Sequence, residues 1–184
     1  MNKILNLSEE EKAYIGGFLD GDGSLNVQIV RRKRHIVRTK DIVKRRTGQR
    51  VYYGYLTRFD YRFNFQIIIS LTFFQKRSTH WFILWLHKKL QSGEIRKKVN
   101  GGSQYTIDGP QNVEKVLEQV KPYLKIKRKQ VILTLEILKN KSKSYDHNSF
   151  LKCCQLVDNI AALNDSKKRK INSAVVRSDL DFFA

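Results

Sequence analysis

The chain has 184 residues, of which 41% are apolar and 11% aromatic, enough to fold around one hydrophobic core. Its 36 Lys and Arg against 17 Asp and Glu give a formal net charge of +19, and a folded protein this basic most often binds a polyanion, with nucleic acid the first candidate. This composition excludes a disordered tail, a disulfide-rich secreted protein and a membrane protein, so we expect an intracellular protein without a membrane partner.

The first predicted element is a helix that begins at Ser8. Ser8 and Glu11 have the spacing of a capping box, in which each side chain accepts a hydrogen bond from the other residue's backbone. Apolar residues then recur at helical spacing as far as Leu19, and Gly21 and Gly23 should end the helix. The chain is therefore expected to open with a helix of a few turns.

The end of this helix carries an unusual combination of glycines and acids. Gly16 and Gly17 each cost about 1 kcal/mol relative to alanine inside a helix, which close approach of another backbone would offset. Asp20 and Asp22 lie at the helix C-terminus, where the macrodipole is already negative. A divalent cation with oxygen ligands, magnesium first, would neutralise them. The alternative is that these glycines and aspartates form a solvated turn.

Strands with one polar face follow the helix. Polar and apolar residues alternate from position 24 to 29 and from 61 to 73, and a hairpin is predicted over 94–108. The amide, hydroxyl and guanidinium groups of the polar faces can match base edges in a major groove, so we predict a DNA-reading sheet; the alternative is a solvated face. The predicted DNA contacts on these faces are Asn26, Gln28, Arg62, Asn64, Gln66, Thr72, Arg96, Lys98, Gln104 and Thr106.

Between the first strands lies a strongly basic stretch. Residues 31–50 contain ten Lys or Arg and a single acid, Asp41. We interpret this stretch as a long basic hairpin or a flexible arm whose cations, Arg32 and Arg34 among them, contact phosphates and position a duplex without reading it. A patch of the nuclear-localisation type is the alternative.

Helices dominate the rest of the chain. Ser78 is predicted to cap a second helix that carries Trp81 and Trp85 in the core, and helices recur over about residues 112–184. The order is helix, strands, helix, strands and then helices. It predicts one α+β domain over residues 1–184, with an antiparallel sheet whose second face is polar and basic.

The ten residues Ile15 to Ser24, IGGFLDGDGS, resemble the LAGLIDADG motif of homing endonucleases. In that family the motif helices of two subunits, or of two halves of one chain, pack side by side and bring one acidic residue each to a shared DNA cleft. Because the chain holds a single copy of the motif, the resemblance implies a homodimer with Tyr14, Gly16 and Gly17 at its interface. It also implies the family's fold, a twisted antiparallel DNA-binding sheet backed by helices, with the motif helix at the dimer interface.

Later segments resemble the single-motif, homodimeric branch of the family that is encoded within group I introns of ribosomal RNA genes. These segments are residues 71–82, 122–130 and 161–170. The likeness covers about residues 14–180, with a longer basic insertion around 31–60.

Position by position, the resemblance implies a catalytic site. Asp22 would be a metal ligand together with the Gly21 carbonyl, Gln75 would order water, and Lys127 would lie near the scissile phosphate. The metal implied is Mg²⁺, with Mn²⁺ or Ca²⁺ as alternatives at the same site.

The resemblance also places cations beside the DNA. Where the family often has a second active-site arginine this chain has Thr79, so a substitute cation would come from Arg77, from His80 or from no residue. Lys167 and Lys168 of the last similar segment would contact DNA.

The function implied by the resemblance is site-specific DNA cleavage. Such a homing endonuclease makes a double-strand break in a long, near-palindromic DNA target by metal-dependent hydrolysis. It would act in whichever compartment holds the host ribosomal RNA gene. The alternative is a protein that keeps the fold without cutting, namely an RNA maturase acting on intron RNA or a DNA- or RNA-binding regulator. A ribosomal RNA-binding protein would explain the charge but not the glycines and aspartates of the motif.

Overall fold

The computed structural model describes residues 6–32, 35–44, 50–59, 63–99, 101–141, 146–164 and 169–182. The strands are β1 (Gly23–Arg31), β2 (His35–Lys44), β3 (Arg50–Phe59), β4 (Phe65–Lys76), β5 (Glu94–Lys97) and β6 (Gly102–Asp108). The helices are α1 (Glu9–Gly21), α2 (His80–Leu90), α3 (Pro110–Val120), α4 (Arg128–Lys141), α5 (His147–Ala162) and α6 (Ser173–Phe182), with 3₁₀ turns η1 (Arg77–Thr79) and η2 (Lys121–Tyr123). The α+β class is confirmed. Within the described ranges, no helix is long and apolar enough to cross a membrane.

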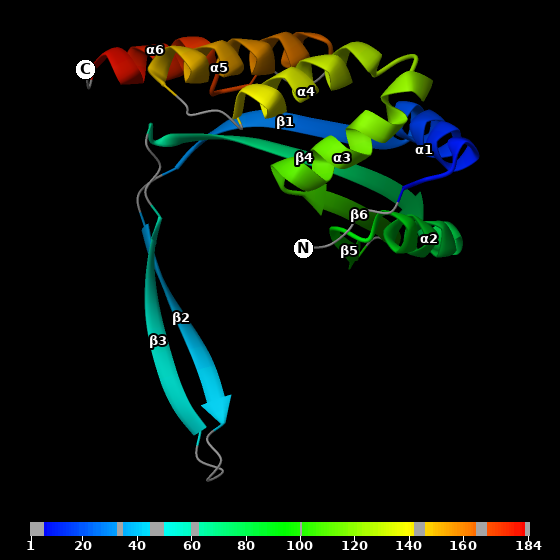
Figure 1. Cartoon of the computed structure of the whole chain (residues 1–184), viewed down its shortest axis with the longest axis horizontal. Coiled ribbons are helices and arrows are strands. Elements are labelled where there is room, and N and C mark those ends of the chain that lie inside the picture. The colour runs from blue at the N-terminus through cyan, green and yellow to red at the C-terminus, as the bar shows by residue number, and fades with distance from the viewer. Residues whose placement is uncertain are drawn as a thin grey trace.

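A four-stranded antiparallel sheet forms the centre of the molecule, in the order β1-β4-β6-β5. Gly23 pairs with Phe73 at one end of the β1–β4 ladder, and Arg31 pairs with Phe65 at the other. Successive residues of a strand point to opposite faces, so this register puts the odd-numbered residues of both strands on one face. Helices α3, α4 and α5 pack on the sheet, as Figure 1 shows, and leave its other face open.

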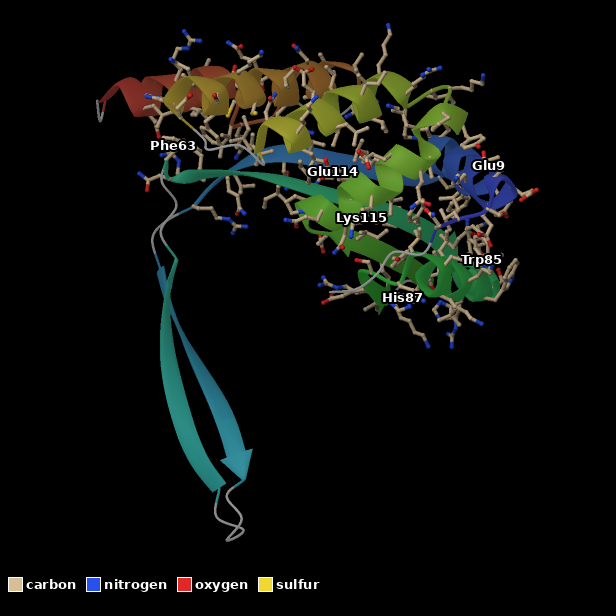
Figure 2. The ribbon with its side chains drawn as sticks, in the orientation of Figure 1. Glu9, Phe63, Trp85, His87, Glu114 and Lys115 are labelled. Carbon is tan, nitrogen blue, oxygen red and sulfur yellow. The ribbon has the colours of Figure 1, made fainter. Side chains whose placement is uncertain are left out.

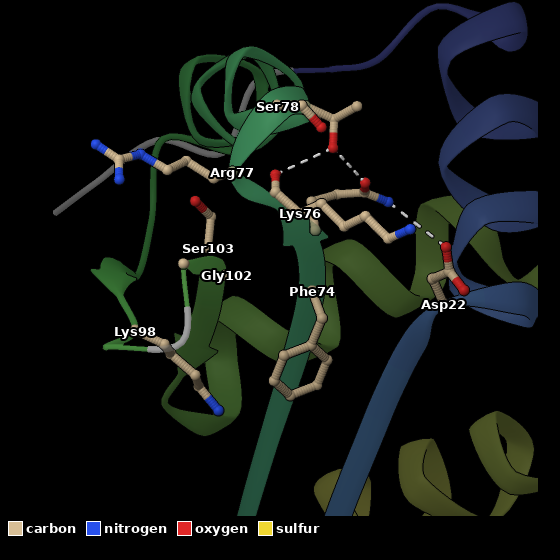
Figure 3. Close-up of a pocket in the computed structure, with 11 residues that line it drawn as sticks. Asp22, Phe74, Lys76, Arg77, Ser78, Lys98, Gly102 and Ser103 are labelled. Atoms are coloured by element: carbon tan, nitrogen blue, oxygen red, sulfur yellow. Dashed lines mark hydrogen bonds between the residues drawn. The ribbon is translucent and has the colours of Figure 1, made fainter.

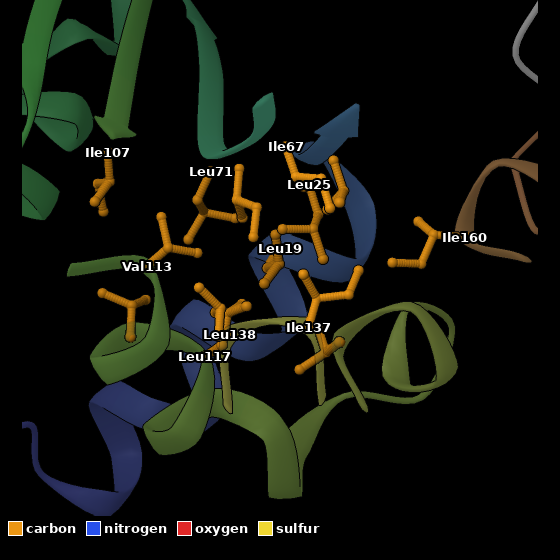
Figure 4. Close-up of a cluster of buried hydrophobic side chains, with 14 of the residues drawn as sticks. Leu19, Leu25, Ile67, Leu71, Ile107, Val113, Leu117, Ile137, Leu138 and Ile160 are labelled. Carbon is orange, nitrogen blue, oxygen red and sulfur yellow. The ribbon is translucent and has the colours of Figure 1, made fainter. Parts of the chain in front are cut away.

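The hydrophobic core lies between the sheet and its helices. The odd-numbered residues from 23 to 29 in β1 and from 65 to 73 in β4 are buried because the helices cover that face, which explains the alternation in the sequence. Leu19 of α1, Leu71 of β4, Leu117 of α3 and Ile137 of α4 are completely buried and belong to one cluster, shown in Figure 4. Burial of each such side chain is worth about 1.5–3 kcal/mol. The core therefore fixes α1 against the sheet that bears the polar face.

Helix α1 begins as predicted and meets its own chain at Gly16. The capping box between Ser8 and Glu11 is present in both directions. Gly16 is buried, and a Cβ there would lie 3.0 Å from the Cβ of Tyr123 in η2. The close approach expected for the glycine pair is therefore made within the monomer, and the prediction that Gly16 lies at a dimer interface is corrected. Gly17 is exposed, and a Cβ there would meet no atom within 4 Å.

Helix α2 begins differently from the prediction. Ser78, the predicted cap, lies inside η1, and the N-cap residue is Thr79, whose side chain makes no capping bond. The hydroxyl of Thr79 instead lies 2.6 Å from Oε1 of Gln75. The Thr79 hydroxyl, which could have capped α2, therefore binds Gln75 instead.

The basic insertion forms a separate antiparallel ribbon in which β2 pairs with β3. The hairpin interpretation is therefore confirmed over these two strands. At the root of the ribbon the backbone N–H of Arg32 donates to the Asn64 carbonyl at 2.8 Å, and Phe63 stacks on Phe150 of α5 with ring centroids 4.9 Å apart. Figure 2 shows Phe63 at this end of the molecule, opposite Trp85. Of the alternation predicted from residue 61, residues 61 and 62 lie outside the described residues, Phe63 and Asn64 precede the strand, and β4 begins at Phe65.

Two isoleucines of α4 give a matched test of this arrangement. Ile137 is completely buried, whereas Ile132 is 47% exposed. Ile137→Ala should lower the free energy of unfolding by about 2–5 kcal/mol because it leaves a cavity in the core. Ile132→Ala should cost less than about 1 kcal/mol. Urea unfolding measures both, and equal losses would contradict the assigned helix face.

Candidate active site

The carboxylate of Asp20, at the end of α1, is bound by its own chain. It accepts hydrogen bonds from the backbone N–H groups of Lys125 at 2.6 Å, Ile126 at 3.1 Å and Lys127 at 2.9 Å. Three successive amides form an anion-binding concavity of the kind known as a nest. The Lys127 ammonium also donates to the Asp20 carbonyl. The negative charge of Asp20 is therefore met by backbone amides, and the cation expected between the two aspartates is not needed at this residue.

These bonds also set the protonation of Asp20. Burial raises the pKa of its carboxyl, but the backbone N–H donors, helped by the Lys127 charge, lower it more, so the pKa lies below its usual value. Asp20 is therefore ionised across the physiological range.

Asp22 is placed in the opposite way. It is the exposed C-cap residue of α1, and the side-chain amide of Gln75 lies 3.5 Å from its Oδ2. The Thr79 hydroxyl approaches both Oε1 of Gln75 and the Lys76 carbonyl, at 2.6 and 3.1 Å. Figure 3 draws these contacts as dashed lines, one of which ends at Asp22. Thr79 thus holds the amide of Gln75 with its nitrogen toward Asp22.

Asp22 and Gln75 line a hollow of about 950 Å³ with a basic rim. Lys76, Arg77 and Lys98 also line it, and Asp22 is the single acid among its lining residues. Arg77 and Lys98 lie across the hollow from Asp22 in Figure 3. The hollow therefore presents one carboxylate facing cations that suit a phosphodiester. Lys76 was not among the residues predicted for the site, although it directly follows Gln75.

His80, the other candidate for a substitute cation, lies in an adjoining hollow. Arg77 and His80 both line it, together with Lys97 and Ser103. His80 is engaged through Nδ1, which lies 2.8 Å from the Ser103 hydroxyl oxygen. Since Arg77 also lines the hollow that contains Asp22, it is the better placed of the two.

Lys127 lies in a different hollow from Asp22 and Gln75. This hollow of about 270 Å³ is lined by Ser24 and Asn26 of β1, by Lys127, and by Arg169. Arg169 donates to the Val27 carbonyl, and burial lowers the pKa of its guanidinium. The bond from Lys127 to the Asp20 carbonyl brings the ammonium to the end of α1, two residues before Asp22. Arg169 was missed because the sequence shows a basic run without indicating which member turns inward.

The open face of the sheet carries most of those predicted DNA contacts that lie in the described part of the chain. By the register of the three ladders, the even-numbered residues of β1, β4, β6 and β5 share this face. The predicted residues that it brings together are Asn26, Gln28, Gln66, Thr72, Arg96, Gln104 and Thr106. Arg34, Arg62, Lys167 and Lys168 lie outside the described residues and stay predictions.

Some of these polar side chains have partners on the face itself. Thr72 is only 7% exposed, and its hydroxyl lies 3.3 Å from that of Thr106, to which Gln104 donates at 2.9 Å. The prediction that Thr72 contacts DNA is therefore corrected, because its neighbours cover it. Arg32 donates through Nε to Gln66 at 3.1 Å, so these two residues form one unit at the end of the sheet.

Two predicted contacts lie beside the strands rather than within them. Asn64, just before β4, is exposed and has a left-handed backbone with φ 55°. Lys98 follows β5, and its ammonium lies 5.1 Å from the centre of the Phe74 ring.

An apolar patch is exposed on α1 and α2. Tyr14 is 56% exposed and meets Phe82 edge-on, with ring centroids 5.7 Å apart; Phe82 in turn contacts Trp81. Trp81 is 64% exposed, so its predicted place in the core is wrong; Phe82, the next residue, fills that place instead. Trp85 is half-buried, and Leu84 is exposed. We call Tyr14, Trp81 and Leu84 the aromatic patch.

The donor set at the end of α1 suits a hard cation. Asp22 offers a carboxylate, and Gly21 lies in the last helical turn, where carbonyls lack intrahelical partners. Among the residues that the structure describes, no three His, Cys, Asp or Glu side chains are close enough together to hold a metal. Mg²⁺ usually keeps several water ligands and takes one or two carboxylates, so Asp22 and the Gly21 carbonyl are donors of the kind that it binds.

Comparison with known proteins gives the family. No family model matches the chain. It is 32% identical over 168 residues to the DNA endonuclease I-CvuI of Chlorella vulgaris, covering 91% of this chain and 88% of the relative. To the DNA endonuclease I-CreI of Chlamydomonas reinhardtii it is 32% identical over 175 residues, covering 95% and 91%. The chain belongs to the LAGLIDADG homing endonucleases. This membership confirms the family resemblance of the motif in α1.

The fold agrees with this membership. The crystal structure of I-CvuI with its target in the presence of Ca matches at a TM-score of 0.75 and 31% identity, covering 94% of both chains. A second I-CvuI structure, with the I-CreI target and Mg, matches at 0.73 and 30%, covering 95% and 94%. The predicted LAGLIDADG fold is thus confirmed.

The bonds to Asp20 predict how stability depends on pH. Because its pKa is lower in the folded protein than in the unfolded chain, near 3.9, the carboxylate stabilises the fold above that pH. This contribution is lost as the pH falls through the lower, folded-state pKa. Asp20→Asn should therefore lower the free energy of unfolding at pH 7, and its difference from wild type should shrink toward about pH 3.

Urea unfolding across this pH range measures the difference. Glu118→Gln, which removes one exposed carboxylate from α3, is the control and should change little at any pH. A wild-type advantage over Asp20→Asn that is the same at both ends of the range would contradict the ionised role of Asp20.

Proposed function

We propose that this chain is a homodimeric, site-specific DNA endonuclease of the homing type. The observation that carries the proposal is Asp22, exposed at the end of the motif helix and joined to Gln75 in a basic hollow beside the polar face of the sheet. Relatives that match nearly the whole chain are named DNA endonucleases. The substrate is double-stranded DNA, and the reaction is hydrolysis of one phosphodiester bond in each strand.

Each residue of the site has a separate task. A divalent cation, Mg²⁺ with Mn²⁺ or Ca²⁺ as substitutes, would be held by the Asp22 carboxylate and the Gly21 carbonyl, and it supplies activation of water and stabilisation of the leaving 3′ oxygen. Gln75, held by Thr79, orients the attacking water. Lys127 offsets the charge that builds up on the phosphate in the transition state.

Arg77 provides a further positive charge at the site. It lines the same hollow as Asp22 and Gln75, whereas Thr79 is occupied with Gln75. We assign to Arg77 the charge that an arginine at position 79 would supply.

Two chains are needed because each contributes one Asp22 and duplex DNA has two strands. The outer face of α1 carries Tyr14, Gly17 and Gly21, all exposed, and a Cβ at either glycine would meet nothing within 4 Å. A second α1 can approach this stripe closely because it has no bulky side chain beyond Tyr14. Trp81 and Leu84 of the aromatic patch adjoin it and extend the apolar surface that the second copy would cover. The twofold symmetry of such a dimer makes its target nearly palindromic.

Replacing the proposed metal ligand separates cutting from binding. Asp22→Asn should lower cleavage by at least about 10²-fold while leaving the protein bound to its site, because the amide keeps the shape but loses the charge that attracts a cation. Selection of cleaved sites from a ribosomal-gene library gives the substrate. Plasmid nicking with and without Mg²⁺, and gel shift in Ca²⁺, give the two readouts.

Glu118→Gln is the matched control because it also removes one negative charge, on the helix side of the sheet. It should cut at the wild-type rate. Wild-type protein that binds DNA without nicking it in Mg²⁺ would favour a non-cleaving member of the family. Near-normal cutting by Asp22→Asn would remove Asp22 from the site.

The aromatic patch predicts a simple change in oligomeric state. Trp81→Glu should convert the dimer to a monomer, because a carboxylate buried without a partner costs several kcal/mol. Its fold should persist, since Trp81 is largely exposed in the monomer. Sedimentation velocity measures the mass. Ile132→Glu, on the exposed side of α4, should stay dimeric; a dimer of unchanged affinity in Trp81→Glu would place the interface elsewhere.

A further inference from the structure

We propose that the β2–β3 ribbon is a second DNA-contacting unit, which binds the phosphate backbone of the duplex outside the segment covered by the four-stranded sheet. The proposal rests on the proposed function, which supplies the direction in which the duplex runs. It gives this enzyme a longer footprint than its reading face alone would produce.

The register of the ribbon separates its charges onto one face. Residues pair so that even-numbered positions of β2 oppose even-numbered positions of β3, and odd oppose odd. Since successive positions alternate between faces, all Lys and Arg positions of the two strands fall on the even face, and the single acid, Asp41, falls on the odd one. The basic positions are Arg38, Lys40, Lys44, Arg50 and Arg58.

This arrangement is unfavourable for a ribbon without a partner. Lys44 and Arg50 are directly opposite each other in the ladder, and like charges in cross-strand positions destabilise a sheet. A polyanion laid along the even face would reverse the sign of that interaction. The charge pattern therefore points to a partner with regularly spaced negative charge, as a nucleic-acid backbone has.

The composition of the even face indicates phosphate binding rather than base reading. Its other positions are apolar or glycine, apart from Tyr52, and it has no Asn, Gln, Ser or Thr. The open face of the sheet, by contrast, carries amides such as Asn26 and Gln28. Contacts to phosphates position a protein, and contacts to base edges specify the sequence. The even face of the ribbon would thus position the duplex, and the open face of the sheet would read its sequence.

The geometry carries the ribbon past the reading face. Figure 1 shows β2 and β3 leaving the sheet at the end remote from α1 and extending away from helices α4–α6. Along β1, nine residues separate that end from Asp22, about 30 Å at 3.3 Å per residue. The ribbon itself has ten residues in each strand, about 33 Å, which matches one turn of B-DNA. Its contacts therefore begin roughly nine base pairs from the cleavage site.

The root of the ribbon is held on both sides. Arg31 pairs with Asp179 of α6, and its guanidinium lies 4.8 Å above the Phe65 ring. Arg32 bonds Gln66 and the Asn64 carbonyl, as described above. The ends of β1 and β4 nearest the ribbon are therefore tied to the helices and to each other.

The test removes two charges from the even face. Full-length Arg38→Gln/Lys40→Gln is compared with Lys115→Gln/Lys152→Gln, which removes two exposed charges from α3 and α5. The probe is a mixed-sequence DNA duplex of about 40 base pairs, or about four turns. Each lost phosphate contact changes the slope of log K against log salt by about 0.9, so the ribbon variant should lose about 1.8 per chain and the control nothing.

Equal losses in both variants, or no loss in either, would overturn the proposal. The same titration on an RNA duplex distinguishes the other polyanion, since a loss on RNA alone would also overturn it. Should Arg38→Gln/Lys40→Gln fail to fold, Lys44→Gln/Arg50→Gln, at the far end of the ribbon, replaces it. On the selected target, the hydroxyl-radical footprint of the ribbon variant should retract at both outer edges while cleavage at the centre persists.

The two proposals fail separately. If the wild type never cuts DNA in Mg²⁺, the proposed function is lost, but the salt slope on mixed-sequence DNA still decides whether the ribbon binds phosphates. If cutting is normal and the slope is unchanged, only the ribbon proposal is lost.

Discussion

The contact between the Asp20 carboxylate and three consecutive backbone amides holds the end of the motif helix against the segment that precedes α4. A carboxylate at a helix C-terminus is repelled by the macrodipole, so this position is unfavourable unless donors surround it. The donors come from residues more than a hundred positions away in the chain. The same loop carries Lys127, whose ammonium donates a further hydrogen bond to the Asp20 carbonyl. The rest of the active site depends on this junction, because it fixes where α1 ends.

The two aspartates at the end of α1 have different surroundings. The carboxylate of Asp20 is bound by backbone amides and has a structural role, whereas Asp22 is exposed, with Gln75 as its neighbour. The Thr79 hydroxyl orients that neighbour, and Lys76 and Arg77 add positive charge around the same hollow. One chain would thus supply half of the proposed reactive centre. The exposed glycines and aromatic residues of α1 and α2 offer the surface on which the other half would be joined.

The elements with strong local patterns were predictable from the sequence. The capping box at Ser8, the alternation in β1 and β4 and the turn before β6 each rest on short-range chemistry, and each is present. Tertiary contacts decided the rest. Gly16 lies against Tyr123, and Thr72 is covered by Thr106 and Gln104. Neither contact could be predicted from the residues next to Gly16 or Thr72 in the chain.

The candidate site likewise contains residues that the sequence could identify and contacts that only the tertiary structure shows. The family resemblance pointed to Asp22 through the motif and to Gln75 through the later segment 71–82, and the structure brings the two residues together. It could not show that Thr79 holds Gln75, or that Lys127 faces a different hollow, because these facts depend on how β4, η1 and the loop before α4 meet. Trp81 was misplaced for a similar reason, since helical spacing alone does not say which of two adjacent aromatic residues points inward.

The cluster of Thr72, Thr106 and Gln104 has a consequence for engineering new target preferences. Its hydroxyls and amide satisfy one another in the middle of the reading surface, so a larger or differently polar residue at position 72 would disturb the contact between β4 and β6 before it met a base. Redesign should therefore leave this floor intact and vary the flanking positions of β1, where Asn26 and Gln28 have room to change. Mutant libraries for new targets would then vary only residues that can reach a substrate.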